Sequence, residues 1–214
     1  MEYLVTMTTH VPGGTPEAAV DDVRAREAAH SRDLAAQRHL LRLWRPPLEP
    51  GEWRSLGLFA AGDEAELQAV LASMPLHVWR TDEVTPLSPH PNDPPPAPAG
   101  PAAQAGLPDP PAAGEHPAAE FLTTFTLTIP EGTLAEEVAA ADAGERDRTR
   151  ELAARGHLER LWGLPGQGRA LGLWRAGDRA AMQAILASLP LAAWLDVQTT
   201  PVTPHPSDPG ITRS

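Results

Sequence analysis

Apolar and polar residues alternate along residues 3–9, as they do in a strand that buries one face. Residues 16–42 are rich in Ala, Glu and Arg and carry apolar side chains at helical spacing, which predicts a long helix. Two short strands are expected at residues 43–45 and 53–59, because apolar runs there flank a loop with Pro and Gly. The predicted order is therefore strand, helix, strand, strand.

A second helix and a final strand complete this pattern. Asp63 followed by Glu66 is typical of a capped helix start, and Pro75 ends the apolar stripe that follows. Residues 78–87 are expected to form the last strand. The resulting order of elements, βαββαβ, is that of the ferredoxin-like α+β fold.

The whole pattern occurs twice in the chain. Residues 2–45 align without a gap with residues 120–163, and LGLFAAGDEAELQAVLASMPLHVW later aligns with LGLWRAGDRAAMQAILASLPLAAW. One face of each sheet needs a partner, and two copies in one chain supply it, so we expect an intramolecular pseudo-dimeric α+β barrel. A segment rich in Pro and Ala between the copies predicts an extended linker. The predicted organisation is module one at residues 1–91, the linker at 92–117 and module two at 118–214.

Composition narrows the chemistry. All 17 basic residues are arginine and cysteine is absent, which excludes lysine Schiff bases, P-loop lysines, disulfides and thiolate nucleophiles. Tyrosine and asparagine each occur once, as Tyr3 and Asn92. A catalytic acid or base must therefore come from Asp, Glu or His.

The formal net charge of −11 argues against a nucleic-acid partner, because phosphate binding needs a cationic surface. The chain opens with an alternating segment and not with a basic start and a long apolar run, and no later stretch is apolar enough to span a membrane. We therefore expect a cytoplasmic protein that acts on a small molecule, with neither nucleic acid nor membrane as partner. The sequence leaves open whether the chain assembles further into homo-oligomers.

Four short sequence motifs recur in the same order in both copies. Copy one carries EYLVTMT, RHLLRLWR, SMPLHVW and TPLSPHP, and copy two carries EFLTTFT, GHLERLWG, SLPLAAW and TPVTPHP. In this order and spacing they resemble the muconolactone delta-isomerase family over nearly all of both modules. The resemblance implies ferredoxin-like modules that pair as an α+β barrel, no metal or organic cofactor, and double-bond migration in a small unsaturated lactone.

The resemblance puts the family's proton carrier at Glu27 in copy one and at Glu145 in copy two. A 1,3-proton shift needs one base that reaches both carbons, and a buried carboxyl group with a raised pKa can accept and return the same proton. His30 follows Glu27 by three residues on the same helical face and is a candidate for a Glu–His relay. Copy two has Arg148 there, which we expect to favour the charged form of Glu145. The alternative for both glutamates is an ordinary solvated helix carboxylate.

The third strand departs from the family pattern. Relatives offer a tyrosine and an asparagine toward the lactone, whereas this chain has Trp53 and Ser55 in copy one and Gly168 and Ala170 in copy two. We therefore expect a substrate that differs from muconolactone itself. The composition is typical of GC-rich genomes, which favours a role in a specialised biosynthetic pathway.

Further binding candidates lie outside the first helix. Arg45 follows the Leu-Trp pair of copy one and can hold a substrate carboxylate by two hydrogen bonds. Gly163 occupies the equivalent position in copy two. Trp79 and Trp194 recur at equivalent positions, where packing is the alternative to a place in the ligand pocket. Arg169 is the corresponding candidate on the third strand of copy two.

The repeated PHP histidines, His90 and His205, follow the last strand of each copy. Neither copy shows HxH or HExxH spacing, so we predict no metal site. We expect both histidines to anchor the tail of one copy over the neighbouring module. The predicted activity is thus a cofactor-independent isomerase. A related lyase or cyclase, a non-catalytic ligand-binding or assembly module and a cofactorless oxygenase are the alternatives.

Overall fold

The computed structural model describes residues 1–95 and 119–211 and divides into two compact units. Unit 1 consists of Met1–Ser88 and Val202–Ser214, and unit 2 of Pro89–Pro201. Each unit thus includes the segment that follows the last strand of the other copy, here called the tail, which a division at residues 91 and 118 does not show. Residues 96–117 of the predicted linker lie outside the described residues.

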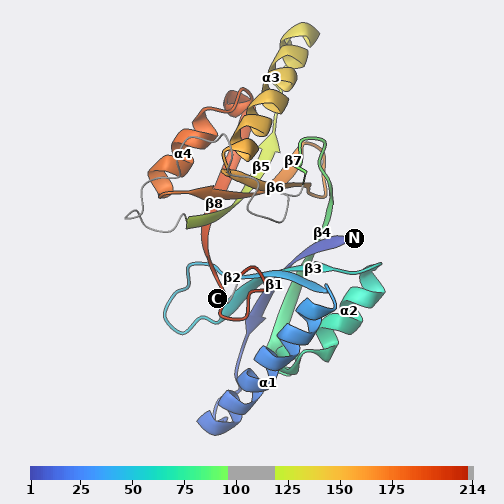
Figure 1. Cartoon of the computed structure of the whole chain (residues 1–214), viewed down its shortest axis with the longest axis vertical. Helices are drawn as coiled ribbons and strands as arrows, with labels where there is room; N and C mark the ends of the chain where they lie inside the picture. Colours follow the sequence, from blue (N-terminus) through green and yellow to red (C-terminus); the bar gives the residue numbers. More distant parts are fainter. Residues whose placement is uncertain (96–118, 212–214) are drawn as a thin grey trace. The chain divides into compact units, whose positions relative to one another are not determined.

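Unit 1 is a four-stranded antiparallel sheet with its helices on one face (Figure 1). The strand order is β4-β1-β3-β2, and the end of β8 (Leu195–Pro204) pairs with the outer edge of β2. The elements are β1 (Glu2–Thr9), α1 (Glu17–Ala36), β2 (Leu40–Arg45), β3 (Arg54–Ala60), α2 (Glu64–Ser73), the 3-10 helix η1 (Pro75–Trp79) and β4 (Arg80–Pro89).

Unit 2 repeats this arrangement with the strand order β6-β7-β5-β8. Its elements are β5 (Ala119–Leu127), α3 (Ala135–Ala154), β6 (Leu158–Gly163), β7 (Arg169–Ala176), α4 (Arg179–Ala187) and the 3-10 helix η3 (Ala192–Trp194), followed by β8. The prediction of an α+β fold built from two βαββαβ modules is confirmed.

The core of each unit lies between the sheet and its two helices. In β1 every second residue is buried, including Val5 and Met7, because alternate side chains of a strand point to one face. Leu34 of α1 and Leu71 of α2 pack in the same cluster. The alternation seen in the sequence therefore selects the face that the helices cover.

The predicted first helix is too long at its C-terminal end. It was expected to reach residue 42, but α1 ends at Ala36 and β2 already begins at Leu40. Arg38 has a φ of 62°, in the left-handed region, and Gly156 occupies the equivalent position in copy two with a φ of 73°. A residue in that conformation terminates a helix, and glycine is its usual occupant. In the sequence, only copy two therefore carries the glycine that marks the end of this helix.

The last predicted strand also begins too early. Residues 78 and 79 belong to η1, because Pro75 starts a tight 3-10 turn after α2, and β4 begins at Arg80. The start of α2 is confirmed, since the Asp63 carboxylate accepts from the Glu66 N–H at 2.8 Å.

Candidate active site

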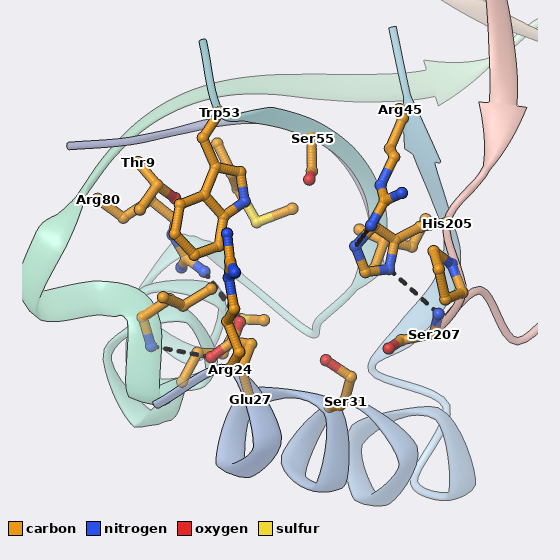
Figure 2. A pocket seen from close by; sticks show the side chains of 16 residues that line it. Thr9, Arg24, Glu27, Ser31, Arg45, Trp53, Ser55, Arg80, His205 and Ser207 are labelled. Atoms are coloured by element: carbon orange, nitrogen blue, oxygen red, sulfur yellow. Dashed lines mark hydrogen bonds and ion pairs between the residues drawn. The ribbon is translucent and has the colours of Figure 1, made fainter. Parts of the chain in front are cut away.

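A cavity of about 410 Å³ lies in unit 1 between α1 and the sheet (Figure 2). Glu27 and Ser31 face it from one side, one helical turn apart on α1, and Trp53, Ser55 and Arg45 face it from the opposite side. Four of these five residues are predicted site residues. The fifth, Ser31, could have been found from its spacing to Glu27, because helix positions four apart share a face.

Glu27 is held from the far side by the turn that precedes β4. The main-chain N–H of Leu76 donates to its Oε2 at 2.9 Å, and Arg80 Nη1 lies 3.5 Å from Oε1. Burial raises the pKa of Glu27, and this effect outweighs the Leu76 hydrogen bond and the Arg80 charge, which both lower the pKa. The carboxyl group is thus fixed in place and more basic than an exposed glutamate.

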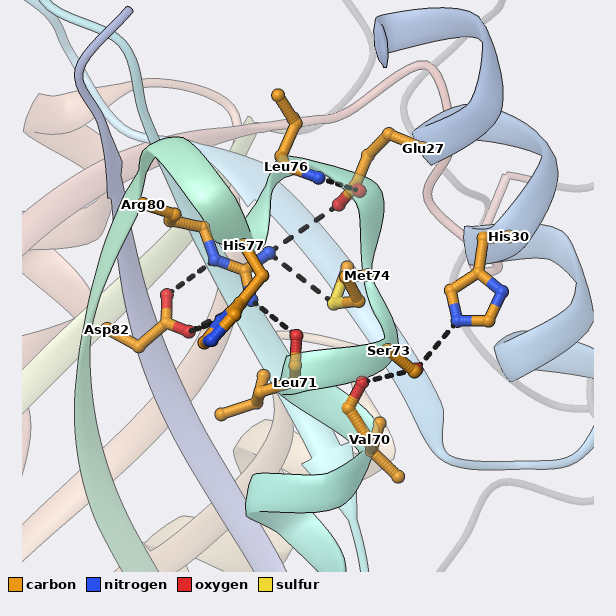
Figure 3. A network of polar contacts seen from close by, with 10 residues as sticks. All are labelled: Glu27, His30, Val70, Leu71, Ser73, Met74, Leu76, His77, Arg80 and Asp82. Carbon is orange, nitrogen blue, oxygen red and sulfur yellow. Dashed lines mark hydrogen bonds and ion pairs between the residues drawn. The ribbon is translucent and has the colours of Figure 1, made fainter.

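Arg80 is the centre of a buried polar network (Figure 3). Its side chain is 2% exposed and its Nε donates to Asp82 at 2.6 Å. Further hydrogen bonds run to the Met74 sulfur and the Leu71 carbonyl oxygen, both at 3.4 Å. The sequence did not identify Arg80, because nothing local distinguishes an arginine at a strand start from an exposed one.

The structure does not bring His30 to Glu27. His30 Nε2 hydrogen-bonds the Ser73 hydroxyl at 2.8 Å, at the end of α2, and its ring points away from the carboxylate (Figure 3). Arg148 does the same in unit 2, where its Nη2 donates to the Ser188 hydroxyl at 2.8 Å. Both residues join one helix to the other, and Arg148 does not contribute to the pKa shift of Glu145. The direct Glu–His relay and the expected influence of Arg148 therefore have no geometric support.

The tail of copy two forms part of the wall of the unit 1 cavity. His205 and Ser207 are among its lining residues, and His205 Nε2 lies 3.4 Å from Arg45 Nη2. The tail is anchored by Asp208, whose Oδ1 accepts from the Leu43 N–H at 2.9 Å. Burial and the Arg45 charge lower the pKa of His205 to about 4, so the ring is neutral at pH 7.

The tail of copy one is held in unit 2 in the same way. Asp93 accepts from the Leu161 N–H at 2.6 Å and lies 3.3 Å from Arg160 Nε. His90 and Asn92 of the same tail line the unit 2 cavity. Each tail thus belongs to the unit of the other copy, but the side chains that anchor it are Asp93 and Asp208 and not the predicted histidines, whose rings line the cavities. These aspartates lie three residues after the PHP histidine in both copies, but the sequence alone does not show that they bind main-chain N–H groups of β2 and β6.

The unit 2 cavity has a volume of about 310 Å³ and is built around Glu145. The Leu191 N–H donates to its Oε2 at 3.1 Å, as Leu76 does for Glu27. Burial raises the pKa of Glu145 as well, and the nearby Asp142 raises it further. The carboxyl site is therefore duplicated in detail, down to its main-chain hydrogen bond.

The remaining predicted residues separate into two groups. Arg169 lines the unit 2 cavity, although its side chain is exposed and its Nη1 donates to the Pro165 carbonyl oxygen at 3.2 Å. Trp79 and Trp194 are half-buried in the 3-10 helices and are not among the described lining residues of either cavity. Their carbonyl oxygens instead bind the strand ends, since Trp79 accepts from His10 N–H at 2.7 Å and Trp194 from Thr128 N–H at 2.8 Å.

A family model described as "Muconolactone delta-isomerase" matches residues 1–93 and 119–208. The chain belongs to the muconolactone delta-isomerase family. The muconolactone delta-isomerase of Cupriavidus pinatubonensis is 35% identical over 92 residues, which cover 43% of this chain and 97% of that protein. Muconolactone delta-isomerase 1 of Acinetobacter lwoffii is 33% identical over 92 residues, covering 43% and 93%. These relatives support an isomerase, and each has the length of one copy of the repeat.

Solved structures support the fold alone. A heme-binding protein from Thermus thermophilus matches 97% of this chain and 93% of its own with a TM-score of 0.58, at 12% sequence identity. Within residues 1–95 and 119–211, no group of three or more His, Asp or Glu side chains is placed to hold a metal ion. No helix in that part of the chain is both long enough and apolar enough to cross a membrane.

Proposed function

We propose that this muconolactone delta-isomerase family member moves a double bond in a small unsaturated lactone, with Glu27 as the proton carrier. The observation that carries the proposal is the buried carboxylate of Glu27 in a cavity wall, with one oxygen held by the Leu76 N–H and a raised pKa. A base of this kind takes a proton from carbon more readily than an exposed carboxylate, because its charged form is less stable.

The proton balance needs no other reactant. Glu27 takes the proton from the ring carbon γ to the carbonyl, and the electron pair spreads over the former double bond to the carbonyl oxygen. Glu27, now protonated, returns the proton to the α carbon of the lactone, so the double bond moves from the α,β to the β,γ position. One carboxyl group suffices, provided that both carbons lie within its reach.

The cavity around Glu27 supports an anionic substrate. Arg24 and Arg45 both line it, and the Arg24 guanidinium stacks over the Trp53 ring at 4.4 Å. A guanidinium matches the two oxygens of a carboxylate. Ser31 is 1% exposed and lines the cavity one helical turn from Glu27, where its hydroxyl can bind a ligand oxygen.

The substrate is proposed to be related to muconolactone and not identical to it. Trp53 and Ser55 stand where relatives have a tyrosine and an asparagine, and both line the cavity. Trp53 adds an apolar surface where the relatives offer a hydroxyl, which favours a bulkier or less polar ring substituent. This difference supports a place in a specialised biosynthetic pathway.

The test is a set of isosteric substitutions. Glu27→Gln, Glu145→Gln and the double variant are assayed with muconolactone and alkyl-substituted unsaturated γ-lactones, by the change in ultraviolet absorption on isomerisation. The double variant should lose about 10²–10⁴-fold in kcat, the usual contribution of a general base. The matched control is Glu64→Gln at the exposed start of α2, which should leave turnover unchanged. Undiminished turnover in the double variant would contradict the proposal.

The predicted intramolecular pseudo-dimer is also retained as a proposal. Its support is that each unit includes the tail of the other copy, so neither unit is complete from one copy alone. Sedimentation and small-angle scattering of the full chain should show one compact particle per chain. Two independently moving units would argue against it.

A further inference from the structure

The two cavities are equivalent in backbone and different in charge. Where the unit 1 cavity has Arg24 and Arg80 among its lining residues, the equivalent positions in unit 2 are Asp142 and Leu195. Arg45, the third arginine of the unit 1 lining, is replaced by Gly163. Both glutamates are kept, so the difference concerns what binds beside the carboxyl group.

Unit 1 keeps positive charge available for a ligand. Arg80 is neutralised by Glu27 and Asp82, and only Arg24 and Arg45 are left to meet an anion. Arg24 has only a loose, exposed ion pair, at 3.6 Å from Asp21. No carboxylate pairs with Arg45 in the described parts of the chain.

His205, in the tail that lines the unit 1 cavity, provides a second hydrogen-bond donor beside Arg45. The Ser207 N–H donates to Nδ1 of His205 at 3.1 Å, a shorter contact than the 3.4 Å between Nε2 and Arg45 Nη2, and because a neutral imidazole accepts at one nitrogen only we place the ring proton on Nε2. That N–H lies 3.4 Å from the Arg45 guanidinium, so two donors face the same space. A carboxylate accepts from both, which no neutral carbonyl oxygen does as strongly.

Unit 2 keeps the histidine donor without the arginine. The Asn92 N–H donates to Nδ1 of His90 at 3.1 Å, so the same tautomer is assigned there. Burial lowers the pKa of His90, and the ring is neutral at pH 7. A single neutral N–H suits a carbonyl or ester oxygen.

The rest of the unit 2 lining is more apolar and carries fewer arginines than that of unit 1. Leu127 replaces Thr9, Ala170 replaces Ser55 and Leu195 replaces Arg80. Asp142, at the position of Arg24, pairs with the exposed Arg146 at 2.6 Å and offers no positive charge to an anion. Arg169 is the one arginine of the described lining, and it is exposed, as Arg24 and Arg45 are, so unit 2 offers one arginine to an anion where unit 1 offers two.

A buried donor in unit 2 also lacks a partner. The indole Nε1 of Trp174 is buried and makes no hydrogen bond in the described part of the chain, and Trp174 lines the cavity. Phe59 stands at the equivalent position in copy one and has no such donor. An unpaired buried N–H is costly unless a ligand or water completes it.

We infer that the two cavities take ligands of different charge: unit 1 binds a lactone with a free carboxylate, and unit 2 binds an uncharged lactone or ester. This inference rests on the proposed function, because it assumes the same lactone ring in both cavities. It predicts that one chain processes two related compounds and does not carry two copies of one site.

The experiment uses muconolactone and its methyl ester, which differ only in the charge of the side chain. Each is titrated into the full-length, ¹⁵N-labelled protein at pH 7, and the indole N–H signals of Trp53 and Trp174 report on the two cavities. The signals are assigned with Trp53→Phe and Trp174→Phe. The free acid should shift the Trp53 signal at concentrations about 10- to 100-fold below those that shift Trp174, the usual effect of a charge-assisted hydrogen bond. The ester should shift the Trp174 signal first or at the same concentration.

Two substitutions exchange the cavity charges. Arg45→Gly should abolish the preference of unit 1 for the acid, and Gly163→Arg should increase the acid affinity of unit 2 about tenfold or more. Equal response of both indoles to the acid, or failure of the ester to reach Trp174, would overturn the inference. Because these readouts measure binding, they decide it even when turnover is absent, and absent turnover would count against the proposed function alone.

Discussion

Glu27 Oε1 lies 3.5 Å from Arg80 Nη1, whereas its twin Glu145 has a leucine, Leu195, at the position equivalent to Arg80. Burial raises the pKa of both carboxyl groups, but only that of Glu27 is moderated by a cation. Two copies of one site are therefore expected to differ in basicity as well as in ligand charge.

The first prediction concerns the pH dependence of turnover. Glu27 must be charged to take a proton, and burial raises its pKa above the ordinary 4.5, while Arg80 and His30 lower it and Asp82 raises it. In the variant Glu145→Gln, where only unit 1 carries a base, kcat/KM should fall as the pH falls through this raised pKa. A pH–rate profile measures it, and an acid limb at or below 4.5 would be contrary to expectation.

The second prediction exchanges the network of unit 1 for that of unit 2. Arg80→Leu with Asp82→Val copies Leu195 and Val197 and removes the buried Arg80–Asp82 ion pair as a whole, so that Glu27 keeps its Leu76 hydrogen bond and loses its cation, as in the Glu145 site. Because Arg80 lowers the pKa of Glu27 more than Asp82 raises it, the acid limb should move to higher pH. The profile is again recorded in the background of Glu145→Gln. An unmoved limb would mean that Arg80 does not act on the base.

The third prediction concerns the anchored tails. The Asp208 side chain is 0% exposed, so Asp208→Ala leaves the Leu43 N–H and the Arg42 guanidinium without their acceptor. We expect a loss of about 2–3 kcal/mol in the free energy of unfolding in urea and a higher KM for unit 1, because the tail carries His205. Asp93→Ala is the matched variant in unit 2, where the ion pair is more exposed at 33% and 24%, and should cost about 1 kcal/mol. Equal losses in the two variants would contradict this ranking.

The fourth prediction tests the end of α1. Arg38→Gly introduces the residue that copy two uses at the left-handed position and should stabilise the protein by about 0.5–1 kcal/mol, measured by urea unfolding. Gly156→Ala is the reverse control and should destabilise by about the same amount. Stabilisation by both variants, or by neither, would refute the assignment of strain to Arg38.

The fifth prediction concerns stability and pH. The pKa of Glu145 is raised in the folded protein, so its stabilising contribution is complete at low pH and is lost as the pH rises through the folded pKa. Glu145→Gln should therefore raise Tm relative to the parent protein near pH 8, and this gain should shrink as the pH falls toward 4.5. Glu151→Gln is the control of opposite sign, because a hydrogen bond from Arg148 lowers the pKa of Glu151. A gain from Glu145→Gln that does not depend on pH would rule out the ionisation as its cause.

The duplication allowed much of the site to be predicted. Glu27 and Glu145 stand at equivalent positions of two diverged helices, and Ser55 and Trp53 follow from the alignment of β3. Such residues are recognisable because each is set by its own element, and the order of elements fixes which face that element buries. The carboxyl sites are therefore a local property of the repeated sequence.

Other parts of the site depend on contacts between distant segments. Arg80 is a functional cation only because Glu27 and Asp82 meet it in the core, and His30 is unavailable because it is bound to Ser73. Neither relation follows from spacing, since an arginine at a strand start is ordinarily exposed and a histidine next to a glutamate is free to turn either way.

By itself, the sequence determined the α+β fold, its repetition, the family and the two candidate bases, because these follow from periodicity and from matched positions within each copy. Only the tertiary structure decided how each tail is anchored, since Asp208 and Asp93 act on residues remote in the chain. It also decided the charge of each cavity, which depends on how many arginines converge on one carboxyl group and how many of them are already neutralised there.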